Sequence, residues 1–140
     1  MSAADAGYSG TQLPRKLGIK ADARLGLIGA PPEFRATLGA LPPGVRIVER
    51  ARGPLDVIVA FTVSRAELRR RLPALRDALD PAGGLWIAWP KRASCVETDV
   101  TEDVVRELGL AAGLVDNKVC AVDQVWSGLR LVYRLRDRPR

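Results

Sequence analysis

Histidine is absent from the 140 residues of this sequence. Without an imidazole, the chain lacks the means for Ser-His-Asp or Cys-His catalysis, for HExxH metalloprotease sites and for Cys₂His₂ zinc sites. Cysteine is scarce too, because Cys95 and Cys120 are the only two. Two thiols are too few for a disulfide framework or a thiolate metal cage. We therefore expect neither a metal site nor catalytic residues of these kinds.

Long apolar runs are also missing. No segment approaches the roughly 18 apolar residues of a membrane-spanning helix, and the opening MSAADAGYSG lacks the features of a secretory signal peptide. The length suits a single domain. We expect a cytoplasmic protein that does not associate with membranes, with a flexible tail over 1–10, one α/β domain over 11–135 and a basic tail over 136–140.

Lysine and aromatic residues are scarce, whereas arginine is abundant. Only four of the 22 cationic side chains are lysines, and the formal net charge is +6. The arginines cluster at 65–76 and at 130–140, and such clusters can neutralise phosphates or bind an acidic partner. A solvated helix face and a basic tail explain them more simply. The aromatic residues do not alternate with the arginines, so the stacking platform of a single-strand binder is missing.

Apolar runs predict the first strands of a sheet. The runs at 24–29, 55–61 and 85–89 are typical of parallel strands that are covered on both faces. Residues 45–48 form either an edge strand or an extended loop. Only 49–54 connects them to the next run, and a parallel crossover usually needs a dozen residues or more.

Helices are predicted between these runs from their capping residues. Proline suits the first helical position and a serine hydroxyl accepts from the first turn, so helices are expected to begin at Pro31 and after Ser64. Pro73 lies inside the second of these helices and should kink or split it. Asp99 and Glu102 fit a capping box for a third helix.

The end of the chain differs from the alternating pattern before it. Two strands are predicted at 115–122 and 129–135, joined by a hairpin-length loop over 123–128. Alternating strands and helices followed by an antiparallel pair predict an α/β fold: a Rossmann-like, open, mostly parallel sheet with a C-terminal antiparallel hairpin and helices on both faces.

The order of these last elements resembles that in class I S-adenosylmethionine-dependent methyltransferases. Residues 55–59 (LDVIV) resemble their fourth strand, and residues 79–87 (LDPAGGLWI) resemble the turn into their fifth. The resemblance covers about residues 55–135, with motifs that any doubly wound sheet can share. It implies a methyltransferase-like fold.

A second resemblance covers nearly the whole chain. A family of small uncharacterised actinobacterial proteins, classed as a domain of unknown function, is similar to it in GYSGT (7–11), KLGIK (16–20), GAP (29–31), WPK (89–91), DVTEDVVR (99–106), VCAVD (119–123) and WSGL (126–129). This resemblance implies a cytoplasmic bacterial protein and no particular activity.

The methyltransferase resemblance makes the turn after the first strand the place to look for a cofactor. These enzymes carry a glycine-rich turn there, and an acidic residue ending the second strand holds the ribose hydroxyls. In this sequence only Gly29 stands in the turn, and Pro31 and Pro32 remove two backbone N–H donors. Glu49 could take the part of the acidic residue. We interpret the turn as a degenerate cofactor loop and expect no cofactor.

A binding crevice is still expected at the carboxyl ends of the parallel strands. Two tryptophans, a lysine, an arginine and an aspartate gathered there would suit a flat or anionic ligand, although structural capping of the sheet end explains them as well. The candidate residues are Gly29, Pro31, Glu33, Thr62, Arg65, Trp89, Lys91, Ser94, Asp123, Trp126 and Ser127.

The sequence favours a non-enzymatic Rossmann-like module that binds an unknown protein partner or a small anionic, nucleotide-like ligand. Two alternatives stay open. One is a small enzyme, or a protein that binds S-adenosylmethionine or a nucleotide, using the crevice. The other is an arginine-based binder of nucleic acid or of an acidic partner. An apolar patch at the sheet edge would favour a homodimer.

Overall fold

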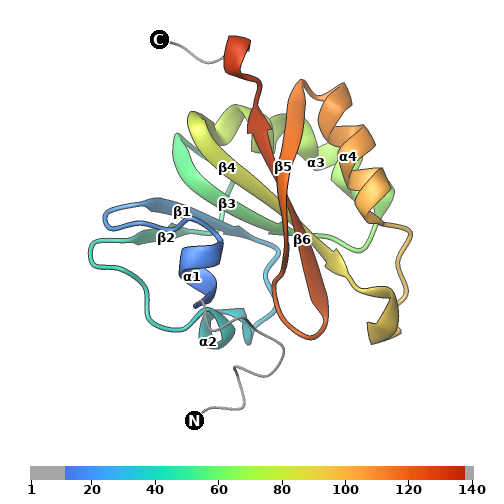
Figure 1. Ribbon diagram of the computed structural model, residues 1–140, viewed down its shortest axis with the longest axis horizontal. Coiled ribbons are helices and arrows are strands. Elements are labelled where there is room, and N and C mark those ends of the chain that lie inside the picture. The colour runs from blue at the N-terminus through green and yellow to red at the C-terminus, as the bar shows by residue number, and fades with distance from the viewer. Residues whose placement is uncertain (1–11, 138–140) are drawn as a thin grey trace.

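The computed structural model describes residues 12–137, which form one six-stranded sheet with helices on both faces (Figure 1). The elements in chain order are α1 (Leu13–Lys16), β1 (Arg24–Ile28), α2 (Phe34–Leu38), β2 (Arg46–Val48), β3 (Leu55–Phe61), α3 (Arg65–Ala78), β4 (Leu79–Pro90), the 3₁₀ helix η2 (Arg92–Ser94), α4 (Glu102–Ala111), β5 (Leu114–Ala121), β6 (Trp126–Tyr133) and the 3₁₀ helix η3 (Leu135–Asp137).

The strand order across the sheet is β2-β1-β3-β4-β6-β5. The first four strands run parallel to one another, and β6 lies antiparallel between β4 and β5. This arrangement confirms the predicted fold class. The carboxyl ends of β1, β2, β3 and β4 consequently share one edge of the sheet, which we call the carboxyl edge.

The core has two layers, one on each face of the sheet. The helices α3 and α4 cover one face, with Ile58, Leu72 and Leu85 among the buried residues between them and the sheet. On the other face, α1 and α2 pack over a second group that includes Leu25 and Trp86. Trp86 is fully buried, and its indole Nε1 donates to the Leu17 carbonyl oxygen at 2.9 Å. That bond ties the end of α1 to the middle strand of the sheet.

Residues 46–48 form an edge strand, which decides between the two predicted alternatives. The strand pairs in parallel with β1, with Val48 beside Gly26. The six residues from Glu49 to Pro54 then return to the start of β3 without a helix. Within this crossover Gly53 packs closely against the end of α3, where a side chain would collide with the Ala78 carbonyl oxygen.

Three local predictions are corrected by the structure. The helix α3 runs unbroken through the exposed Pro73, because α3 buries an apolar face along its length. Thr101, not Asp99, caps α4 by accepting from the Val104 N–H at 3.2 Å. Residues 80–84 form no separate turn but a bulge inside β4, where the register with β3 shifts.

The boundaries near the two ends of the chain differ in part from the predicted ones. The last strand begins at Trp126, three residues earlier than predicted, so that the hairpin loop is shorter. The predicted tail over 1–10 lies outside the described residues, and the predicted basic tail begins within η3 before passing beyond them. No helix in 12–137 has both the length and the apolar run that crossing a membrane requires.

Candidate functional site

The turn after β1 reaches the carboxyl edge at Gly29. This residue has a φ of +66°, and a Cβ atom there would lie 3.2 Å from the Phe61 carbonyl oxygen. Glycine therefore suits both the backbone conformation and the close approach of the β1 and β3 ends. Pro31 follows, and its carbonyl oxygen accepts from the Phe34 N–H at 3.0 Å. The helix α2 begins only at Phe34, three residues later than the sequence predicts.

An acidic residue stands at the end of the neighbouring strand. Glu49 directly follows β2, whose last residue, Val48, is level with Gly26 on β1. Its Oε2 lies 3.3 Å from Nη2 of Arg35 on α2, and 75% of the side chain is exposed. The ion pair holds this carboxylate toward α2, the helix that follows the Gly29 turn, and leaves it accessible to a ligand.

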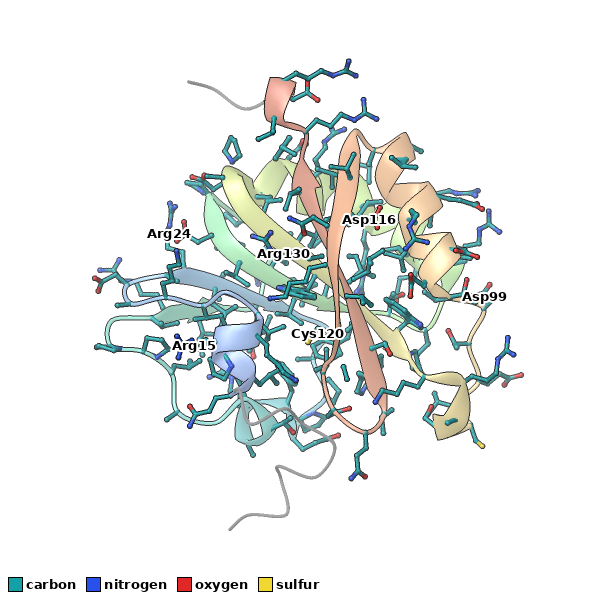
Figure 2. All side chains as sticks on the ribbon, viewed as in Figure 1. Arg15, Arg24, Asp99, Asp116, Cys120 and Arg130 are labelled. Atoms are coloured by element: carbon teal, nitrogen blue, oxygen red, sulfur yellow. The ribbon has the colours of Figure 1, made fainter. Side chains whose placement is uncertain are left out.

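The end of β3 contributes a buried hydroxyl. Thr62 is only 5% exposed, and its Oγ1 donates to the Ser64 carbonyl oxygen at 3.1 Å. Ser64 caps α3 as predicted, accepting from the Glu67 N–H at 3.1 Å. The neighbouring Arg65 N–H donates to Asp99 Oδ1 at 2.7 Å, and Figure 2 shows Asp99 on the loop before α4. Thr62 thus orders the start of α3, and Asp99 joins α3 to the α4 loop.

One cation near this edge was missed by the sequence analysis. Arg71 on α3 forms an ion pair with Glu67, with 3.3 Å between Nη2 and Oε2. Its Nη1 lies 3.5 Å from the position that a Cβ on Gly29 would occupy. The i,i+4 spacing of Glu67 and Arg71 was visible in the sequence, but only the fold brings this guanidinium to the Gly29 turn.

The two candidate tryptophans lie on opposite faces of the sheet. Trp89 is 7% exposed and belongs to the core beneath α3 and α4. Trp126 packs on the other face, edge-on against Phe61 with 5.0 Å between the ring centroids. Phe34 of α2 also packs edge-on against Phe61, at 4.8 Å. Trp126 therefore lies on the same face of the sheet as α2, the helix that follows the Gly29 turn. Trp89 is buried and has no exposed ring face on which a ligand could stack.

The remaining candidates lie where the end of β4 meets the β5–β6 hairpin. The Lys91 N–H donates to the Val125 carbonyl oxygen at 2.7 Å, and Ser94 Oγ donates to the Lys91 carbonyl oxygen at 2.6 Å. Asp123 Oδ1 accepts from the N–H groups of Val125 and Trp126, both at 2.8 Å. These bonds order the loop after β4 and the loop between β5 and β6. The Asp123 carboxylate stabilises the hairpin loop through its two backbone N–H donors.

The last two predicted crevice residues, Glu33 and Ser127, lie on different elements. Glu33 precedes α2 and is exposed, with no side-chain bond to the first turn of that helix. Ser127 lies within β6, opposite Trp89 on β4 and Ala121 on β5, instead of in the loop. Whether the eleven predicted residues bind a ligand together stays a prediction.

The described residues hold no cluster of three or more His, Cys, Asp or Glu side chains arranged for a metal ion. Several of the arginines in 12–137 form ion pairs with acidic side chains. Arg106 contacts carboxylate oxygens of Glu102, Asp103 and Asp116 at 2.6, 3.0 and 3.2 Å, and Arg76 contacts Asp77 at 3.1 Å. Binding of nucleic acid by the arginine clusters stays an untested prediction.

Comparison with known proteins identifies the fold. No protein-family profile matches the chain, and neither does any curated protein sequence. Solved structures do match. The mitomycin 7-O-methyltransferase has a TM-score of 0.63 and 14% identity, covering 80% of this chain and 49% of its own. A S-adenosylmethionine-dependent methyltransferase from Aquifex aeolicus has a TM-score of 0.58 and 15% identity, covering 84% and 85%.

A third similar structure was solved with its cofactor. The magnesium protoporphyrin IX methyltransferase from Synechocystis PCC 6803, with bound S-adenosylmethionine, has a TM-score of 0.55 and 9% identity, covering 87% of this chain and 74% of its own. Likeness at such identities establishes the methyltransferase-like fold. The chain spans about half the length of the mitomycin enzyme.

These neighbours overturn the expectation of a non-enzymatic module. The proteins that share this fold with the chain include methyltransferases of several kinds. They agree better with the predicted alternative of a small enzyme, or a protein that binds S-adenosylmethionine, than with a non-enzymatic module. Pro31 and Pro32 remove N–H donors from the turn, but they leave unchanged the strand order that defines this fold.

Proposed function

We propose that the chain binds S-adenosylmethionine at the carboxyl edge, between the Gly29 turn and Glu49, and acts as a small enzyme of the methyl-transfer class. The observation that carries the proposal is the position of Glu49. It follows the strand next to β1, so that an exposed carboxylate lies on the same edge of the sheet as the glycine turn. This is the relationship that nucleoside-binding α/β sheets use to hold ribose hydroxyls.

The residues fit the adenosine half of this ligand. A carboxylate accepts hydrogen bonds from two vicinal hydroxyls, and Glu49 is exposed enough to do so while paired with Arg35. Gly29 has no side chain and a left-handed backbone, so a ligand can approach the turn closely. Phe34 and Phe61 are buried in the core, and Trp126, which packs edge-on against Phe61, is half-buried and is the member of this row that a ligand could contact.

The amino-acid half of the ligand needs a different arrangement from the usual glycine-rich turn. Pro31 and Pro32 lack N–H groups, so the turn offers fewer donors to a carboxylate. Arg71 would replace these missing N–H donors, because its guanidinium lies beside Gly29 and a guanidinium pairs well with a carboxylate. Bound S-adenosylmethionine supplies an electrophilic methyl group on a sulfonium, while the chain's residues hold and orient it.

Calorimetric titration tests this proposal. S-adenosylmethionine and S-adenosylhomocysteine are titrated into the wild-type chain, Glu49→Gln and the matched control Glu107→Gln, an exposed carboxylate on α4. Both ligands are expected to bind wild type and the control alike, and Glu49→Gln at least about ten-fold more weakly. Absence of binding to wild type, or equal binding by all three, would overturn the proposal.

The finer resemblance to the family of small actinobacterial proteins stays a prediction, and so does a cytoplasmic location. Both are compatible with an enzyme that uses a common intracellular methyl donor. Fractionation of cells that produce the native protein tests the location, and recovery in the membrane fraction would contradict it.

A further inference from the structure

An ion pair on α3 lies at the carboxyl edge, beside the Gly29 turn. Glu67 stands in the first turn of α3, and its Oε2 lies 3.3 Å from Nη2 of Arg71. The other terminal nitrogen of the guanidinium, Nη1, lies next to Gly29 at the end of β1. Because β1 and β3 are neighbours in the sheet and α3 follows β3, the pair stands where these two strands end.

The Glu67 carboxylate can accept a further hydrogen bond without releasing Arg71. Its Oε1 lies 3.4 Å from Thr62 Oγ1, but that hydroxyl has a single hydrogen and lies closer, at 3.1 Å, to the Ser64 carbonyl oxygen. An ionised carboxylate has roughly four acceptor positions, so its contact with Arg71 leaves others unused. The side chains of Glu67 and Arg71 are 31% and 40% exposed, so a ligand at the carboxyl edge can reach both groups.

The ion pair of Glu67 and Arg71 presents charges of both signs without a net charge. Because the carboxylate lies beside the guanidinium, the pair attracts a lone anion less than an unpaired guanidinium would. An α-amino acid group carries an ammonium and a carboxylate on one carbon atom, so each of its charges can face the opposite charge of the pair. The pair is therefore complementary to a zwitterion.

We propose that Glu67 is a specificity-determining residue, which accepts from the ammonium group of S-adenosylmethionine while Arg71 donates to its carboxylate. This inference rests on the proposed function, in which Gly29 and Glu49 hold the adenosine half. It makes the site selective for nucleosides that carry an amino-acid end. A nucleoside without that end, such as 5′-methylthioadenosine, keeps its contact with Glu49 and loses the contacts with the ion pair.

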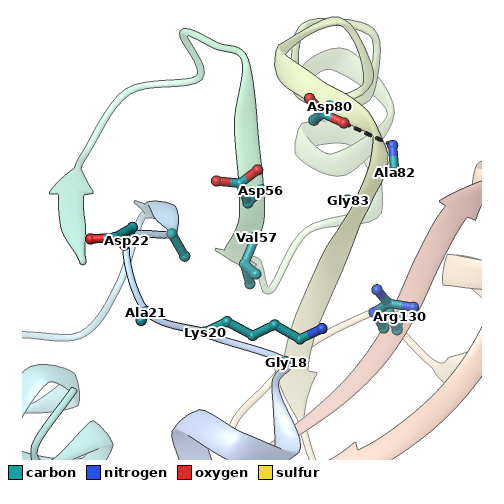
Figure 3. Close-up of a pocket in the computed structure, with 11 residues that line it drawn as sticks. Gly18, Lys20, Ala21, Asp22, Asp56, Val57, Asp80, Ala82, Gly83 and Arg130 are labelled. Atoms are coloured by element: carbon teal, nitrogen blue, oxygen red, sulfur yellow. Dashed lines mark hydrogen bonds between the residues drawn. The ribbon is translucent and has the colours of Figure 1, made fainter. Parts of the chain in front are cut away.

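A polar pocket at the other end of the sheet offers an alternative location for a zwitterion. It has a volume of about 400 Å³ and lies at the amino ends of β3 and β4 (Figure 3). Its charged lining residues are Lys20, Asp22, Asp56, Asp80 and Arg130. Arg24 already contacts two of these carboxylates, Asp56 at 2.8 Å and Asp80 at 3.6 Å. We therefore expect the amino-acid end to bind at Glu67 and Arg71, and the tests below include this pocket as an outcome.

Truncated ligands separate this inference from the proposed function. Wild type is titrated in a calorimeter with S-adenosylhomocysteine and with 5′-methylthioadenosine, and the first is expected to bind at least about ten-fold more tightly. Equal binding of the two would overturn the role of Glu67 and leave the adenosine contacts of the proposed function standing. Absence of binding by both would overturn the proposed function itself and this inference with it.

Charge-removing variants assign the ammonium to Glu67. The probe is S-adenosyl-3-thiopropylamine, which keeps the ammonium and lacks the carboxylate. Glu67→Gln is expected to weaken its binding at least about ten-fold, whereas Arg71→Gln should not weaken it. The matched control is Glu102→Gln, because Glu102 forms the same i,i+4 ion pair with Arg106 on α4, and it should leave binding unchanged.

A purely structural role of Glu67 predicts a different result. If Glu67 only orients Arg71, Glu67→Gln weakens binding of S-adenosylhomocysteine but not of the thiopropylamine, and that outcome would overturn the inference. Unchanged binding of 5′-methylthioadenosine by Glu67→Gln shows that the variant is folded. In a ¹⁵N amide titration with S-adenosylhomocysteine, the Glu67 and Arg71 amides should shift, whereas shifts confined to Lys20 and Gly83 would place the ligand in the polar pocket and contradict the assignment.

Discussion

Arg24 and Asp56 form a bidentate ion pair that joins the amino ends of β1 and β3. Asp56 Oδ2 accepts from both the backbone N–H and Nε of Arg24, at 2.8 and 3.0 Å, while Oδ1 accepts from Nη2 at 2.8 Å. These bonds lower the pKa of the Asp56 carboxyl below its ordinary value.

Stability should therefore depend on pH through Asp56. Its folded-state pKa lies below the unfolded value of about 3.9, so the stabilisation is present above that pH and is lost as pH falls through the folded-state pKa. Asp56→Asn is expected to cost about 1 kcal/mol at pH 6, a value reduced because the side chain is partly exposed. Urea denaturation at pH 6 and pH 2.5 checks this. An equal difference from wild type at both pH values contradicts the assignment.

The indole of Trp86 should be among the strongest single contributors to the free energy of unfolding. Trp86→Phe removes the bond to the Leu17 carbonyl oxygen and leaves a cavity in the core. We expect a loss of about 2–4 kcal/mol, measured as a lower urea midpoint at unchanged slope. Trp126→Phe, at a half-buried position, serves as the control and should cost about 1 kcal/mol. Similar losses in both variants would contradict this role of the hydrogen bond.

Gly29 should be less tolerant of a side chain than another left-handed glycine. Gly29→Ala adds a close contact with the Phe61 carbonyl oxygen to the backbone strain, whereas Gly113, at a φ of +88°, has open space around it. We expect Gly29→Ala to cost about 2 kcal/mol and Gly113→Ala about 1 kcal/mol. Thermal unfolding monitored by circular dichroism compares them. A smaller loss at Gly29 than at Gly113 contradicts the tight packing of the turn.

The two thiols should react at different rates. Cys95 is exposed, whereas Cys120 is half-buried and burial raises the pKa of its thiol. The thiolate is the reactive form, so Cys120 should react slowly with Ellman's reagent at pH 8 and faster as pH rises. A two-phase reaction is expected, with Cys95→Ser lacking the fast phase. Retention of the fast phase in Cys95→Ser contradicts the assignment.

The fold was predictable because its strands are buried apolar runs. Residues 55–61 match β3 at both ends, and the antiparallel pair was expected from the hairpin-length loop. The β4 bulge was not predictable, since Pro81 and Gly83 are typical of a turn and only pairing with β3 shows that the strand continues through them. Local patterns identify elements better than they identify interruptions inside them.

The candidate site was predictable only in part. The position of Gly29 and Glu49 at strand ends follows from topology, so the sequence could place them at one edge. The separation of Trp89 and Trp126 could not be foreseen, because each side chain's face depends on strand register. Arg71 was missed for a similar reason, since its direction is fixed by the packing of α3 against the ends of β1 and β3.

The most direct test of S-adenosylmethionine binding at the carboxyl edge is a ¹⁵N amide titration of the chain with S-adenosylhomocysteine. We expect saturable shifts of the Gly29, Ala30 and Glu49 amides, with the Gly83 amide, near the amino end of β4, unchanged and the shifts greatly reduced in Glu49→Gln. Saturable shifts confined to other residues, or no shifts at millimolar ligand, would contradict it.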